Sequence, residues 1–252
     1  MRLILFIIIV FISTVEFSYA QRKQGVTNYF GFQYRPLIPV NVVGDRPFSM
    51  QEESFLTTVT PVFGYNYGGL VRVGLTEQMA IETGMSYTKR NFRLDYTVSD
   101  SNVVAENRVG FVNYDIPVNW LVYIRLGQDF YANASLGMSL NFYPSNVRTT
   151  TSPFGKHLFI FEGRRGGFFS LDVNSNVGFE YRTKEKGVFY VGFSGKLPLQ
   201  PILLIASEYR HDTFSQVTFE KIEGATVSLD FKYFFHRPAN RGVQFKGGPI
   251  EQ

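Results

Sequence analysis

The sequence contains no cysteine, one tryptophan and three histidines among its 252 residues. The absence of cysteine excludes disulfides, thiolate metal sites, cysteine nucleophiles and anchoring through an acylated cysteine. The histidines, His157, His211 and His236, lie in separate segments without the spacing of a metal site, so we expect no metal and no other cofactor. No phosphate-binding glycine motif precedes a helix, which leaves nucleotide binding unsupported.

Runs of one charge sign and long apolar runs are also scarce. The net charge of +4 comes from 25 basic and 21 acidic residues spread along the chain, which gives nucleic-acid binding little support. The only long apolar run, Leu3 to Ile12, is too short for a comfortable transmembrane helix. No later stretch approaches the roughly 18 apolar residues of such a helix, so none is expected in the rest of the chain.

The N-terminal residues have the order of an export signal. A short positive start at Met1-Arg2 precedes the apolar run, and small residues end at Ala20, just before Gln21. This pattern predicts cleavage after Ala20, and an uncleaved N-terminal anchor is the alternative. The predicted boundaries are a signal peptide at 1–20, a short lead at 21–26, a β-domain at 27–235 and a polar, periplasmic tail at 236–252.

Aromatic residues are abundant, with 26 Phe and 15 Tyr, and they occur in stretches of period two. Both features favour β-strands. In residues 224–235, for example, the odd positions are apolar, and the even positions from Thr226 to Lys232 are polar. The pattern predicts eight strands, at 28–36, 56–75, 79–98, 109–124, 129–143, 169–181, 188–199 and 224–235.

The connections between the predicted strands alternate in length. Short turns at 76–78, 125–128 and 183–187 alternate with long connections at 37–53, 99–108, 144–168 and 200–223, and in the last of these residues 202–206 could also prolong strand structure. This sorting is typical of a transmembrane barrel, whereas a soluble sandwich has no reason for it. Backbone polar groups in hydrocarbon must all be paired, which requires closure. We therefore predict an all-β fold, an eight-stranded antiparallel up-and-down transmembrane β-barrel.

In such a barrel the apolar rows face lipid and the polar rows line the interior. Eight strands leave a lumen just wide enough for side chains, and unpaired buried charges are costly. We therefore expect the inward charges to form ion pairs that plug the lumen; a water-filled channel or proton path is the alternative. The predicted inward charges are Arg35, Arg72, Glu82, Arg90, Asp115, Asp172, Glu180, Arg182, Lys196, Asp230 and Lys232.

Aromatic residues near the ends of the predicted strands suit the girdles that such barrels place at the membrane interfaces. Ordinary strand packing is the alternative. The residues concerned are Tyr29, Tyr87, Trp120, Tyr123, Phe142, Tyr181 and Phe235.

Segments 29–32, 69–75, 81–87 and 112–118 and the final Phe235 carry a resemblance that covers residues 25–235. This part of the chain resembles the outer-membrane β-barrel domain proteins abundant in Bacteroidetes, which are similar to small OmpA-like and OmpX-like barrels and include the PorT-like proteins. It implies a place in the outer membrane of a Gram-negative bacterium, in contact with outer-membrane lipid. It also implies that the barrel-assembly machinery reads the last strand, through Phe231, Tyr233 and Phe235, although the tail beyond Phe235 departs from the simplest pattern.

These motifs say little about activity. We expect a structural or interaction role without enzymatic activity, in which long outer loops bind an envelope protein or polysaccharide. A narrow channel or secretion or transport component is one alternative, and a lipid-modifying enzyme is another. The candidate for catalysis is the Ser-Glu-Tyr-Arg-His-Asp stretch at 207–212, which a solvated loop also explains. The Gly-Arg-Arg-Gly-Gly stretch at 163–167 could bind anionic headgroups or polysaccharide.

Overall fold

The computed structural model describes residues 28–38, 47–153, 155–183, 185–212 and 214–235. The predicted signal peptide, lead and tail lie outside these residues. Within them the chain forms thirteen β-strands, all paired antiparallel, so the all-β prediction is confirmed. No helix in this part of the chain is long and apolar enough to cross a membrane.

The strands of the larger sheet pair in the order β1–β13–β10–β9–β6–β5–β4–β3, and β3 also pairs with β1. The order therefore returns to its start, and we call these strands the ring. Their bounds are β1 (Tyr29–Ile38), β3 (Phe55–Gly74), β4 (Met79–Val98), β5 (Val103–Arg125), β6 (Phe130–Phe142), β9 (Phe169–Arg182), β10 (Val188–Pro198) and β13 (Thr226–Phe234).

Five further strands lie in segments that the sequence predicted as long connections. β2 (Phe48–Glu52) pairs with the first residues of β3. β7 (Val147–Thr151), β8 (His157–Arg165), β11 (Leu203–His211) and β12 (Phe214–Ile222) form a second sheet in the order β12–β11–β8–β7. The prediction of loops was wrong here, because loop-forming residues such as Pro144, Pro153 and Gly155 lie between these strands. Likewise, β5 begins at Val103, inside the polar connection predicted at 99–108.

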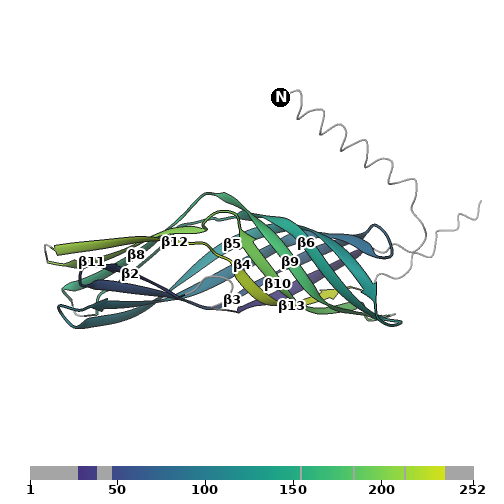
Figure 1. The fold of residues 1–252 in the computed structure, drawn as a ribbon, viewed down its shortest axis with the longest axis horizontal. Helices are drawn as coiled ribbons and strands as arrows, with labels where there is room; N and C mark the ends of the chain where they lie inside the picture. Colours follow the sequence, from purple (N-terminus) through teal and green to yellow (C-terminus); the bar gives the residue numbers. More distant parts are fainter. Residues whose placement is uncertain (1–27, 39–46, 154, 184, 213, 236–252) are drawn as a thin grey trace, which may run out of the picture.

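The second sheet faces the ends of β2, β3, β4 and β5, and Figure 1 shows these strands continuing the long axis of the molecule beyond the ring. The sheets meet along both edges. Asn107 on β5 donates a hydrogen bond to Thr149 on β7 (2.8 Å), and Gln216 on β12 donates one to Glu53 beside β2 (2.7 Å). We call this region, made of β2, β7, β8, β11, β12 and residues 55–60, 91–98 and 103–111, the extension.

The strands that pass from ring to extension exchange the polarity of their two faces. On β4 the even-numbered side chains face inward, and this row changes from polar residues ending at Arg90 to the buried Phe92, Leu94, Tyr96 and Val98. The outward row changes in the opposite sense, from mainly apolar and aromatic residues that end at Lys89 to Asn91, Arg93, Asp95 and Thr97. The two rows therefore have the polarity of a membrane barrel below Arg90, toward the short turns, and that of a soluble protein above Arg90, toward the extension.

Neighbouring strands make the same exchange at the same level. On β5 the inward row from Val103 to Phe111 is apolar except for Asn107, and it becomes polar at Asn113; Phe111 lies opposite Arg90 in register. On β3 a register shift between Val62 and Tyr65 moves the inward residues from odd to even positions. The common level argues that one boundary in the surroundings, and not local packing, sets the change.

The interior of the extension is a packed apolar core. Four buried aromatic rings meet there, with centroid separations of 4.9 Å between Tyr96 and Phe159 and 5.7 Å between Phe55 and Tyr209. The hydroxyls of Thr57 and Ser207 satisfy each other across this core at 2.7 Å. The end of the molecule distant from the short turns is therefore closed by apolar side chains.

The polarity exchange predicts opposite surroundings for two outward residues of β4, Met85 and Arg93. We expect a fluorophore on Met85→Cys, after reconstitution into vesicles, to be quenched by lipid-borne quenchers, because the apolar outward row lies at this level. The same fluorophore on Arg93→Cys should be quenched by aqueous iodide. The chain has no cysteine, so labelling needs no background correction. Iodide quenching at both positions would show that the ring is not embedded in lipid.

Candidate functional site

The interior of the ring holds a chain of five charged side chains near the short turns. Arg72 lies between two carboxylates, with its guanidinium 2.7 Å from Glu82 and 2.5 Å from Glu180. Lys232 pairs with the other oxygen of Glu82 at 2.5 Å, and Arg182 pairs with the other oxygen of Glu180 at 2.6 Å. Both carboxylates are thus bidentate acceptors between cations, an arrangement that offsets their desolvation.

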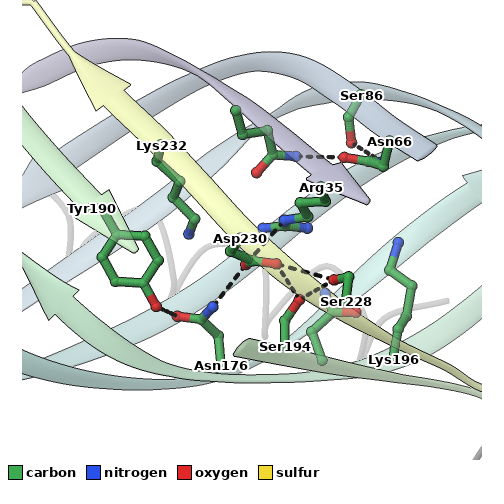
Figure 2. Close-up of polar contacts among 12 residues, drawn as sticks. Arg35, Asn66, Ser86, Asn176, Tyr190, Ser194, Lys196, Ser228, Asp230 and Lys232 are labelled. Carbon is green, nitrogen blue, oxygen red and sulfur yellow. Dashed lines mark hydrogen bonds and ion pairs between the residues drawn. The ribbon is translucent and has the colours of Figure 1, made fainter. Parts of the chain in front are cut away.

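A second polar cluster lies closer to the extension, centred on Asp230 (Figure 2). Arg35 pairs with Asp230 at 3.1 Å, and the same carboxylate accepts hydrogen bonds from Asn176, Ser194 and Ser228. Each oxygen of the Asp230 carboxylate therefore faces two donors, Ser194 and Ser228 on one side and Arg35 and Asn176 on the other.

Lys196, which lies on β10 two residues beyond Ser194, pairs with carboxylates of β5 and β9. Its ammonium group is 2.9 Å from Asp115 and 4.0 Å from Asp172. The other oxygen of Asp115 accepts hydrogen bonds from Thr88 and Asn66. Arg90, at the top of the polar interior, donates to the backbone carbonyl of Gly224.

Strand geometry explains why these side chains meet. Successive side chains alternate across a strand, so one row of each ring strand is directed inward. Inward glycines leave room for the long side chains. A Cβ at Gly178 or Gly192 would lie within 2.4 Å of the Tyr190 hydroxyl. With glycine at both positions, this hydroxyl donates a hydrogen bond to Asn176 at 2.6 Å. Alanine at either position would force the tyrosine out of this contact.

The structure places all eleven predicted charges on the inner face of the ring, nine of them buried and Arg182 and Lys196 partly so. Tyr123, predicted for a girdle, is instead buried in the interior, where the Arg72 and Arg182 guanidiniums lie 5.8 and 4.9 Å from its ring centroid. The prediction for Tyr123 was wrong because its strand position faces inward. Trp120, Phe142, Tyr181 and Phe235 are exposed on the outer face.

A cavity of about 830 Å³ opens at the end of the ring that carries the short turns. Its lining includes Tyr29, Arg72, Tyr123, Tyr131 and Arg182. The guanidinium of Arg182 stacks at 4.0 Å over the Tyr131 ring, and the Arg72 ion pairs form the inner end of the space. The cavity is therefore a vestibule with a charged floor.

The 207–212 stretch does not assemble a catalytic site. Ser207 and His211 share the inner face of β11 but are four residues apart along an extended strand, roughly 13 Å. The Ser207 hydroxyl is bonded to Thr57, and Glu208 faces outward. Hydrogen bonds from Arg210 lower the pKa of Glu208 below its ordinary value. No residue of the stretch is thus within reach to activate the serine.

Two histidines that the sequence placed in separate loops are neighbours in the structure. His157 on β8 and His211 on β11 lie opposite each other in register, and their rings stack at 4.4 Å. His157 Nδ1 also lies 2.7 Å from the Tyr209 hydroxyl. The described residues contain no group of three or more side chains arranged to hold a metal ion.

The basic 163–167 stretch is also more ordered than its composition suggested. Gly163, Arg164 and Arg165 belong to β8. Arg165 donates to the backbone carbonyls of Tyr143 and Pro144 and stacks over Phe168 at 3.5 Å. Arg164 remains exposed beside Glu162. Half of the predicted basic surface is therefore engaged within the chain.

Comparison with known proteins identifies the fold. No family model matches the chain, and no curated protein matches it. The structure is similar to the outer membrane protein OprG from Pseudomonas aeruginosa, with a TM-score of 0.50 and 11% identity over 83% of this chain and 96% of that one. The chain has the fold of an outer-membrane β-barrel protein. The beta domain of the Bordetella autotransporter BrkA also matches, at 12% identity over 82% and 97% of the two chains, but its TM-score of 0.28 carries no weight.

Because Arg72 lies between two buried carboxylates, its removal is predicted to cause a large loss of stability. We expect Arg72→Met to lower the free energy of unfolding by about 3–5 kcal/mol, because Glu82 and Glu180 lose their shared partner. The exposed pair of Arg164 and Glu162 is the control, and Arg164→Met should cost less than about 1 kcal/mol. Urea unfolding followed by the fluorescence of Trp120 measures both. Equal losses would contradict the central place given to Arg72.

Proposed function

We propose that the eight ring strands form a transmembrane barrel in the outer membrane of a Gram-negative bacterium, and that the protein has a structural or interaction role. In this proposal the signal peptide is cleaved after Ala20, and the short turns, both termini and the vestibule face the periplasm. The extension then stands outside the cell. The motifs noted above favour a Bacteroidetes-type, PorT-like barrel.

The filled interior is the observation that carries this proposal. From the vestibule outward, the lumen contains first the ion pairs of Arg72, then the Asp230 cluster, and then the apolar core around Phe159. Two barriers of different chemistry follow each other along one axis. This succession supports a plugged barrel more than a channel or a transport component.

The last strand supports the expected route of assembly. Phe231, Tyr233 and Phe235 point outward at the barrel wall, where Tyr233 contacts Phe32 and Phe189 at 5.6 and 5.1 Å. A barrel-assembly machine that reads the last strand would meet this aromatic row before closure against β1. The inward Phe234 is buried against Arg72, at 3.9 Å.

The extension is the part of the protein that we assign to binding. It is a packed two-sheet unit and not a set of flexible loops, and its outer face carries Phe219, whose side chain is 75% exposed. Leu204 and Val217 are exposed nearby on β11 and β12. An envelope protein or polysaccharide that recognises aromatic surface would bind here.

A plugged barrel predicts electrical silence. In planar bilayers we expect no stepwise conductance from the wild-type protein. Arg72→Ala should also be silent, because the apolar core still closes the outer end, whereas a porin inserted in the same way gives the positive signal. Stepwise currents from the wild type that change on Arg72→Ala would favour the channel alternative.

The interaction role predicts adducts from the extension. A photoreactive residue in place of Phe219 should crosslink to one envelope protein or polysaccharide in native membranes. The same residue in place of Leu136, exposed on the ring wall, should crosslink only to lipid. A second photoreactive residue in place of Leu204 samples the same face. If neither position 219 nor position 204 gives an adduct other than the lipid adduct seen at position 136, the extension is not a binding surface.

A further inference from the structure

The outer wall of the ring carries an apolar groove of about 360 Å³. It is lined by Met85, Tyr114, Ile116, Leu140, Phe142 and Phe169. The groove crosses four neighbouring strands, because Tyr114 lies opposite Phe142 and Phe142 lies opposite Phe169 in register. Its floor is built of outward side chains that the ring presents to lipid, and no polar side chain other than the tyrosine lines it.

A tyrosine cluster borders the groove on the side of the extension. Tyr114 belongs to both, and its ring packs 5.7 Å from Tyr87, which packs 6.3 Å from Tyr65. Tyr67 completes the cluster at 5.2 Å from Tyr87. Aromatic rings with a polar tip suit the boundary between hydrocarbon and headgroups, and this cluster lies just below the polarity exchange of β4.

Lys89 stands at the upper end of this cluster. It lies opposite Tyr65 in register and follows Tyr87 on the same outward face of β4. Its stem lies over Gly110, where an added Cβ would be 3.1 Å from the lysine Cε. The glycine therefore leaves a depression that holds the side chain against β5.

The charge of Lys89 is also unneutralised. Among the described residues it has no ion pair, whereas the next outward cations, Arg93 and Arg108, pair with Asp95 at 3.3 Å and Glu106 at 3.6 Å. One uncompensated ammonium group thus lies above an apolar groove, with tyrosines between them. A basic residue at a membrane surface attracts anionic headgroups, at roughly 1 kcal/mol each.

We propose that the groove and Lys89 form a site for one lipid of the outer leaflet, with an acyl chain in the groove and its phosphate headgroup against Lys89. The assignment follows from complementarity. The apolar groove, the amphipathic tyrosines and the cationic lysine follow one another in the same order as the acyl chain, the interfacial region and the anionic headgroup of such a lipid. It rests on the proposed membrane position of the ring.

Native mass spectrometry of the detergent-extracted protein tests this site with two probes that have the same acyl chains, dioleoyl phosphatidic acid and dioleoylglycerol. The wild type should retain the phosphatidic acid preferentially. Lys89→Gln should lower its retention about fivefold, and Lys89→Arg should restore it. Leu140→Trp, which fills the groove from a lipid-facing position, should lower the retention of both probes.

Lys221→Gln is the matched control, since Lys221 is exposed on β12 of the extension. This variant should retain as much phosphatidic acid as the wild type. Wild-type retention by Lys89→Gln, or equal retention of both probes by the wild type, overturns the lipid site. Displacement of the lipid by millimolar inorganic phosphate, with no effect of Leu140→Trp, would show a free-phosphate site instead.

Two results separate failure of this site from failure of the membrane proposal. Each variant should keep a heat-dependent shift in electrophoretic mobility, the signature of a folded barrel. A wild type without that shift, and with iodide quenching at Met85→Cys, would overturn the membrane position itself. A wild type that passes both tests but shows no phosphate preference would overturn only the lipid site.

Discussion

Strand β1 forms hydrogen bonds along both of its edges, to β13 on one side and to β3 on the other, and the rest of the structure depends on this double pairing. An open sheet would expose two rows of backbone donors and acceptors, which hydrocarbon cannot satisfy. Closure also creates an interior that the inward side chains of all ring strands share. In a ring of eight strands this interior is narrow enough for side chains from different strands to meet. The ion pairs of Arg72 with Glu180 and of Arg35 with Asp230 are consequences of that closure, because their partners come from strands far apart in the sequence.

In the membrane position that we propose, the same strands face two solvents, lipid and water. Below Arg90 the wall of the ring is apolar outside and polar inside, and above it the extension has the reverse arrangement. Hydrophobic burial therefore holds the extension together, as in a soluble domain, whereas paired charges fill the lumen below. Neither half needs a linker, since β3, β4 and β5 run through both. The lipid site that we infer lies where the two solvents meet.

Alternation in the sequence was sufficient to predict the bounds of the ring strands to within two residues, except at the start of β5, which lies six residues earlier than predicted. It also assigned the eleven charges to one face of the strands, the face that the structure directs inward. It could not show which charges pair, because the contact of Arg72 with Glu180 depends on the curvature of the closed sheet. Tyr123 was misplaced because an aromatic residue near a strand end suits either face. The sequence did contain a signal for the extension. In β4 the apolar residues move from odd to even positions after Arg90, which indicates that the strand continues beyond the ring with its apolar face turned inward.

The unbroken course of β4 has a mechanical consequence. Its 20 residues extend over roughly 66 Å of strand, whereas a tilted crossing of the bilayer needs only about 9 to 11 residues. The remainder is a stiff post continuous with the wall below it. In the orientation that we propose, whatever attaches to the tip is held at a fixed height and orientation over the cell surface, and a pull on it is transmitted along the hydrogen-bonded strands directly to the wall of the ring.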